Sequence, residues 1–233
     1  MIGTIINVIA IIVGSTLGIF FGSRLPKTMK STITAGLGLF TISIGLSMFL
    51  KTEESLIVLG GLLVGAVLGE WWKIEEGLEN LGRWFETRFG GNNAEESHRF
   101  IRGFVTASLI FCIGPLAILG SIQDGLVGDY ELLAVKSVLD AFASLAFAST
   151  FGIGVVFSVF PVFIYQGGIT LFAGLLNAVV TDAMLTEMTA AGGVILIGLA
   201  ISSLLEIKKI RIGSFLPALA VAPLIVWILS LFS

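Results

Sequence analysis

The chain of 233 residues is 56% hydrophobic and only 12% charged, which is about half the charged fraction of a soluble domain. This composition excludes an ordinary soluble enzyme and a disordered chain, and the net charge of -3 offers no basic surface for nucleic acid. The single histidine makes a histidine-based metal site improbable, and the single cysteine excludes a disulfide within the chain. No cofactor is expected. The composition predicts a polytopic helical membrane protein.

Apolar segments follow one another along the chain, separated by charged residues or by Gly and Pro. Crossing a bilayer takes about 20 residues, and the sequence holds no run of period-2 alternation that would favour a barrel. In chain order the predicted spans are 2–22, 34–50, 56–72, 104–122, 132–151, 154–180, 192–205 and 215–231. We therefore predict an all-α transmembrane bundle of about eight spans, forming one integral membrane domain over residues 1–233.

Lys and Arg gather in the odd-numbered loops of this scheme, which follow the first, third and seventh spans. The loops between them carry mainly Asp and Glu. Because cytoplasmic loops are enriched in Lys and Arg, this pattern predicts that both termini lie outside the cytoplasm.

One long polar stretch, residues 73–90, lies in the second of the basic loops. Its apolar residues recur at spacings of three and four, and its glutamates occupy other faces. This pattern predicts an amphipathic helix in the inner membrane interface. The alternative is a docking helix for a cytoplasmic partner.

Two internal similarities point to a transporter-like architecture. Residues 34–50 align with residues 189–205 at a constant offset, and the two spans are predicted to have opposite orientations, as in an inverted-topology repeat. In addition, Pro115 and Pro161 are each followed by a polar break, at Gly120–Ser121 and Gln166–Gly167. Each proline predicts a helix broken within the membrane, whose freed backbone groups line a site. Two ordinary proline kinks are the alternative.

Glycines at spacing four form one row on the first span and another on the third. Small residues let helix backbones approach closely in lipid. The rows predict that spans one and three pack against each other, and a homodimer seam is the alternative. The residues are Gly14, Gly18, Gly22, Gly61, Gly65 and Gly69.

Polar residues within the spans are the candidates for function, because charges and amides at membrane depth are costly. Asp140 lies about 12 Å inside span five and forms one stripe with Lys136 and Ser144. Asn7 shares the glycine face of span one. Each has a structural alternative: an ion pair, an interhelical hydrogen bond or an outer-loop position. The candidate pathway residues are Asn7, Pro115, Ser121, Gln123, Asp124, Lys136, Asp140, Ser144 and Gln166.

Several short motifs spread over nearly the whole chain form a combination that is specific although each motif is weak. They include Cys112-x-Gly114-Pro115, Lys136-Ser137-x-x-Asp140, Tyr165-Gln166-Gly167 and Leu216-Pro217-Ala218. In combination the chain resembles the bacterial membrane family called domain of unknown function 554. The resemblance implies a bacterial inner-membrane protein and supplies neither a substrate nor site residues.

The leading hypothesis for function is a small secondary transporter or channel for an ion or small solute, with spans four, five and six as the pathway wall. The alternative is a non-transporting membrane scaffold or regulatory subunit that binds a partner protein. An enzyme is not expected, because the sequence holds no phosphate-binding loop, zinc-protease motif or nucleophile elbow. Expected partners are the lipid bilayer, a small molecule or ion, and a second copy of the chain.

Overall fold

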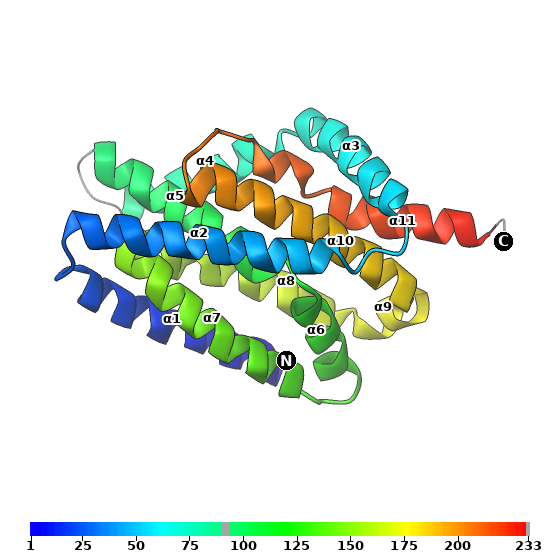
Figure 1. Ribbon diagram of the computed structural model, residues 1–233. Helices are drawn as coiled ribbons and strands as arrows, with labels where there is room; N and C mark the ends of the chain where they lie inside the picture. Colours follow the sequence, from blue (N-terminus) through cyan, green and yellow to red (C-terminus); the bar gives the residue numbers. More distant parts are fainter. Residues whose placement is uncertain (90–93, 232–233) are drawn as a thin grey trace. The chain divides into compact units, whose positions relative to one another are not determined.

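A computed structural model describes residues 1–89 and 94–231, and this part of the chain is helical without strands, which confirms the all-α prediction (Figure 1). The first helices are α1 (Ile2–Gly22), α2 (Lys27–Phe49), α3 (Ser55–Trp71), α4 (Ile74–Phe89), α5 (Ala94–Cys112) and α6 (Pro115–Leu126). They are followed by α7 (Glu131–Phe151), the 3₁₀ segment η1 (Gly152–Ser158), α8 (Val159–Leu171) and α9 (Ala173–Val179). The last elements are α10 (Asp182–Leu199), the π-helical turn η2 (Ala200–Leu204), the 3₁₀ turn η3 (Ile212–Phe215) and α11 (Ala218–Ser230).

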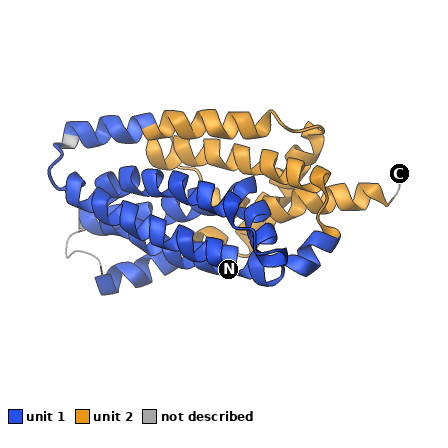
Figure 2. Ribbon diagram, turned by 90° about the horizontal axis from the view of Figure 1, so that it is seen from below, with its two compact units in different colours: residues 1–36, 79–178 blue, residues 37–78, 179–233 orange. Residues whose placement is uncertain are grey.

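The chain divides into two compact units, each built from two separate stretches of sequence (Figure 2). Unit 1 comprises residues 1–36 and 79–178, and unit 2 comprises residues 37–78 and 179–233.

In unit 1 the glycine row of α1 lies directly against α7. A Cβ on Gly14, Gly18 or Gly22 would collide with the backbone of α7, so only glycine permits this approach. The residues met are Ala141, Leu145 and Ser149. Because the residue numbers rise together along both helices, α1 and α7 run parallel.

In unit 2 the glycine row of α3 lies against the start of α11 and the turn before it. A Cβ on Gly65 would lie 2.5 Å from the backbone nitrogen of Ala218, while Gly61 lies against Ala222 and Gly69 against Ser214. The residue numbers of the contacts fall along α11 as they rise along α3, so α3 and α11 are antiparallel. Each glycine row therefore packs on a helix other than the one predicted, and the pairing of spans one and three is wrong.

The chain reverses direction at Gly152. Asp140 of α7 and Gln166 of α8 lie 3.0 and 3.3 Å from the same Asn7 amide nitrogen. A straight helix would hold Asp140 and Gln166 about 39 Å apart, at about 1.5 Å per residue. Gly152, the first residue of η1, has φ of 78°, a left-handed conformation that favours glycine. Helices α7 and α8 therefore run antiparallel, as two passes through unit 1.

By length and apolarity, the described residues contain five helices able to cross a membrane, or up to seven if each bent pair is one span. The bent pairs are α3 with α4, at 56°, and α5 with α6, at 62°. One of the five candidates is the 41-residue stretch Glu131–Leu171, which contains the reversal at Gly152. The number of eight spans and the inverted repeat both stay predictions.

The predicted helix breaks differ in outcome. Between α5 and α6 the chain bends at Gly114, whose φ is 153°, and Pro115 is the first residue of α6. The bend therefore lies before the proline and not at Gly120–Ser121, where the sequence predicts it, because α6 continues through both residues. The break expected after Pro161 is absent, because α8 continues through Gln166 and Gly167 to Leu171. Pro161 lies in the first turn of α8, where proline costs no intrahelical hydrogen bond.

The predicted amphipathic segment 73–90 corresponds to α4, Ile74–Phe89. Its central Phe85 is buried against Phe100 and Phe104 in an aromatic cluster that Phe157 also contacts. Trp84 and Phe89, by contrast, are exposed. Part of the apolar face of α4 thus packs on protein rather than facing outward.

Candidate functional site

Three helices of unit 1 bring four polar side chains together away from solvent. Asn7 of α1 donates from Nδ2 to Asp140 Oδ2 of α7 at 3.0 Å and to Gln166 Oε1 of α8 at 3.3 Å. Lys136, one turn before Asp140, forms an ion pair with the same carboxylate oxygen. Asn7 and Gln166 are 0% exposed, Lys136 6% and Asp140 8%. We call Asn7, Lys136, Asp140 and Gln166 the Asp140 cluster.

The local sequence explains how the Asp140 cluster forms. Asn7 and Gly14 are seven residues apart on one face of α1, and the close approach at Gly14 holds the short asparagine side chain against α7. Lys136 and Asp140 are neighbours because residues four apart share a helix face. Gln166 joins them only through the reversal at Gly152.

The hydrogen bonds fix which way both amides point. Asn7 must present its NH₂ group to the Asp140 carboxylate, and the same group then requires the oxygen of Gln166 as its second acceptor. The other ends of the two amides, Asn7 Oδ1 and Gln166 Nε2, are buried without a hydrogen-bond partner among the described residues. Leaving a buried polar group unpaired costs about 1–3 kcal/mol, so this pair of atoms is a strong candidate for contact with a ligand.

Buried hydroxyls without a partner in the described part of the chain extend from the Asp140 cluster in both directions along unit 1. Thr4 lies one turn before Asn7 on α1, and Thr170 lies one turn after Gln166 on α8. Further along α1, beyond Asn7, lies Ser15. Thr106, Ser121 and Thr150 complete the set. Thr4 with Asn7 on α1, and Gln166 with Thr170 on α8, are each spaced one helical turn apart, and we call these groups the hydroxyl file.

The helix break between α5 and α6 lies near the Asp140 cluster. The helix that follows the break, α6, packs on both α7 and α8, which carry Asp140 and Gln166. Asp140 and Gln166 meet through Asn7, whereas a shared cavity with the break at Pro115 stays a prediction.

The remaining predicted pathway residues have local roles or are placed apart from the Asp140 cluster. Asp124 accepts hydrogen bonds from the Gly3 backbone N–H at 3.1 Å and from the Met1 amino group at 3.0 Å, so it holds the first turn of α1. Ser144 donates to the Ala141 carbonyl at 2.9 Å beside Gly14. Gln123 is exposed on α6, while Ser121 is buried.

Sequence reasoning missed several of these groups. Thr4 and Thr170 could have been found by extending the faces of Asn7 and Gln166 by one helical turn. Glu187 belongs to one of the acidic loops of the eight-span scheme, where a carboxylate is expected to face water, yet it is only 3% exposed. It accepts hydrogen bonds from the Thr52 hydroxyl at 2.5 Å and from the backbone N–H groups of Glu53 and Glu54, just before α3.

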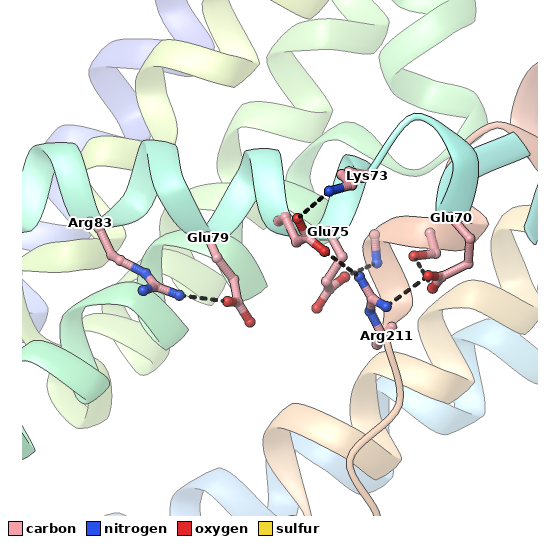
Figure 3. A network of polar contacts seen from close by, with 9 residues as sticks. Glu70, Lys73, Glu75, Glu79, Arg83 and Arg211 are labelled. Carbon is pink, nitrogen blue, oxygen red and sulfur yellow. Dashed lines mark hydrogen bonds and ion pairs between the residues drawn. The ribbon is translucent and has the colours of Figure 1, made fainter.

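A surface network in unit 2 ties the turn between α3 and α4 to the segment before α11 (Figure 3). Glu70 accepts from Arg211 at 2.7 Å and from the Ser214 hydroxyl at 2.7 Å. Glu75 accepts from the Gly213 backbone N–H at 2.5 Å. About half of the Glu70 and Arg211 side chains is exposed, so this network is a structural clamp rather than a membrane-embedded site.

Comparison with known proteins gives a family pattern and two relatives. The pattern of the family described as "Protein of unknown function (DUF554)" matches residues 2–227. The "Uncharacterized membrane protein YdfK" of Bacillus subtilis (strain 168) is 29% identical over 236 residues, covering 100% of this chain and 98% of the relative. The "Uncharacterized protein YqgA" of Escherichia coli (strain K12) is 29% identical over 223 residues, covering 95% and 94%. No solved structure matches the chain.

Proposed function

We propose that this chain, which belongs to the protein family of unknown function DUF554, is a secondary transporter or channel that passes an ion or small polar solute through unit 1. The family expected from the motifs is thereby confirmed, and the chain is a membrane protein with several apolar helices, as its relative YdfK is named. The observation that carries the proposal is the Asp140 cluster, with Asn7 Oδ1 and Gln166 Nε2 buried and unpartnered among the described residues.

A purely structural ion pair explains these residues less well than a pathway does. Lys136 and Asp140 satisfy each other on one helix and need no asparagine from α1. Burying two additional amides, each with one end unpaired, lowers the free energy of unfolding. Apolar side chains of the same size would pack equally well without that penalty. Polar groups kept in such a place are most readily explained by contact with something that moves past them.

The hydroxyl file supports the same function. Thr4 and Thr170 lie one helical turn from Asn7 and Gln166, and on the same side of the Asp140 cluster because α1 and α8 run in opposite directions. A solute that leaves water must exchange its hydrogen bonds for others, and groups spaced one helical turn apart provide that exchange in steps of about 5 Å.

The relative directions of the helices within each unit support the eight-span scheme and the inverted repeat. In the eight-span scheme spans one and five run in the same direction, and α1 and α7 do run parallel. Spans two and seven, and likewise three and eight, should be opposed. In unit 2, Gly45 of α2 packs on Gly193 of α10, and α2 runs antiparallel to α10 as α3 does to α11.

The alternative, a non-transporting scaffold or regulatory subunit in the bacterial inner membrane, draws on α4. Trp84 and Phe89 are exposed there and would suit a partner protein as well as a membrane surface. A stoichiometric partner that copurifies in mild detergent would support this alternative.

The test is flux through purified protein in liposomes, followed with a potassium-sensitive dye, a pH-sensitive dye, and light scattering for urea and glycerol. Asn7→Leu keeps the side-chain size but removes the amide that joins Asp140 to Gln166, and should lower flux at least about tenfold. Thr16→Val is the matched control, because Thr16 lies exposed on the same helix. Wild-type flux in folded Asn7→Leu protein, or no flux with any probe, would reject the proposal.

A further inference from the structure

The charges in the Asp140 cluster compensate each other. Lys136 and Asp140 form a direct ion pair, and Asp140 Oδ2 also accepts from Asn7. A bare cation at this position would face a carboxylate already occupied by an ammonium group, and a bare anion would face the reverse. An ion that leaves water loses a large hydration free energy, and its attraction to a Lys–Asp pair of zero net charge offsets little of that loss.

The groups left over are neutral, and they differ in kind. Asn7 Oδ1 is an acceptor and Gln166 Nε2 is a donor, and the hydrogen bonds to Asp140 and Gln166 Oε1 leave neither amide free to turn over. A molecule that carries both a donor and an acceptor can satisfy both atoms at once. A molecule that only accepts, or one without polar atoms, leaves at least one unpaired.

The neighbouring groups of the file have the same character. Thr4 and Thr170 carry hydroxyl groups, which donate and accept hydrogen bonds and carry no charge. Steps of three and four residues along a helix are about 4.5 and 6 Å, which suits a molecule of a few heavy atoms.

We infer that the pathway of unit 1 takes a small uncharged polar solute that both donates and accepts hydrogen bonds, of the size and class of urea, rather than a free ion. This inference rests on the proposed function and names its substrate class. In it, Gln166 Nε2 donates to the solute, Asn7 Oδ1 accepts from it, and the Lys136–Asp140 pair holds Asn7 in place without contributing net charge.

The experiment compares urea and potassium in the same proteoliposomes. Vesicles loaded with buffer are mixed with hyperosmotic urea in a stopped-flow instrument, and reswelling is followed by light scattering. Parallel vesicles carry a potassium gradient and a dye that reports potassium efflux. We expect urea reswelling well above that of protein-free vesicles, with potassium efflux equal to theirs.

Two variants locate the effect, and a third controls for the reconstitution. Gln166→Met preserves side-chain length but removes the donor, and it should slow urea reswelling about tenfold, the factor for one hydrogen bond of about 1.4 kcal/mol. Thr4→Val removes one hydroxyl of the file without changing its shape and should slow it less. Thr16→Val, exposed on the same helix, should leave the rate unchanged. Size-exclusion profiles and melting curves in detergent establish that each variant is folded.

The outcomes separate the two proposals. Potassium or proton flux without urea reswelling would overturn the substrate class and leave the transporter proposal standing. Urea reswelling that Gln166→Met and Thr4→Val both leave intact in folded protein would place the route elsewhere and overturn this inference. No flux of urea, potassium or protons through folded protein would reject the proposed function and the inference with it.

Discussion

Removing the two charges of the Asp140 cluster singly and together distinguishes a pathway from a structural pair. Lys136→Met leaves the Asp140 carboxylate buried without its ammonium partner, and Asp140→Asn leaves the ammonium without its carboxylate. Both residues are less than a tenth exposed, so solvent screens the remaining charge poorly. Each single variant should therefore lower the free energy of unfolding by about 3–5 kcal/mol.

The double variant Lys136→Met with Asp140→Asn buries no charge, and its free energy of unfolding should lie within about 1–2 kcal/mol of wild type. Asparagine at position 140 can either accept from Asn7 or donate to it, whereas a carboxylate only accepts. Flux should therefore fall, because Asn7 and Gln166 are no longer held in one orientation.

The assays are equilibrium unfolding in mixed detergent micelles, followed by tryptophan fluorescence, and flux in liposomes at matched protein content. A double variant as unstable as either single variant would refute the charge-compensation reasoning. A well-folded double variant with wild-type flux would leave Lys136 and Asp140 as a structural ion pair only.

Three further predictions concern packing, orientation and helix capping. Gly65→Ala should lower the free energy of unfolding by about 1–3 kcal/mol, because its Cβ would lie 2.5 Å from the Ala218 backbone nitrogen. Gly36→Ala is the control and should not lower it, because no atom lies within 4 Å of that Cβ. Equal melting temperatures of the two variants would contradict the close packing. In a Cys112→Ser background, His98→Cys should react with an impermeant maleimide only after the cytoplasmic side is opened, and labelling of intact cells would reverse the orientation. Glu187→Ala should lower the free energy of chemical unfolding by about 1–3 kcal/mol, because it leaves the Thr52 hydroxyl and backbone N–H groups before α3 unpaired. The control is Glu96→Ala at an exposed position. A loss for Glu187→Ala smaller than that of the control would show that water replaces the carboxylate.

The fold class and most helix positions could be predicted because apolarity and helix length are local properties of the sequence. The first predicted span coincides with α1, Ile2–Gly22, and the bend near Pro115 follows from proline chemistry. Helix partners could not be predicted in the same way. A glycine row shows which face of a helix approaches another backbone, but it does not identify the partner helix.

The candidate site shows the same division. Asn7, Lys136, Asp140 and Gln166 could be singled out because polar side chains in apolar segments are rare. That they meet depends on the reversal at Gly152, a tertiary feature with only a weak local signal, since glycine is frequent throughout this chain. The prediction of a break after Pro161 is wrong because a proline in the first turn of a helix leaves that helix intact. Whether these residues form a pathway stays a prediction.

The interleaving of the two units along the sequence sets the order in which they can be completed during biosynthesis. Unit 1 has all its residues once residue 178 has been made, but α2 and α3 must wait for residues 179–233 before unit 2 can close. During that interval Gly61 and Gly65 of α3 lack the α11 backbone on which they pack. Domains generally fold as units while the chain is being synthesised, the N-terminal part first. A chain that stops near residue 178 should therefore contain a complete unit 1 joined to residues 37–78, which lack their packing partners, and cells should degrade it faster than the full-length chain.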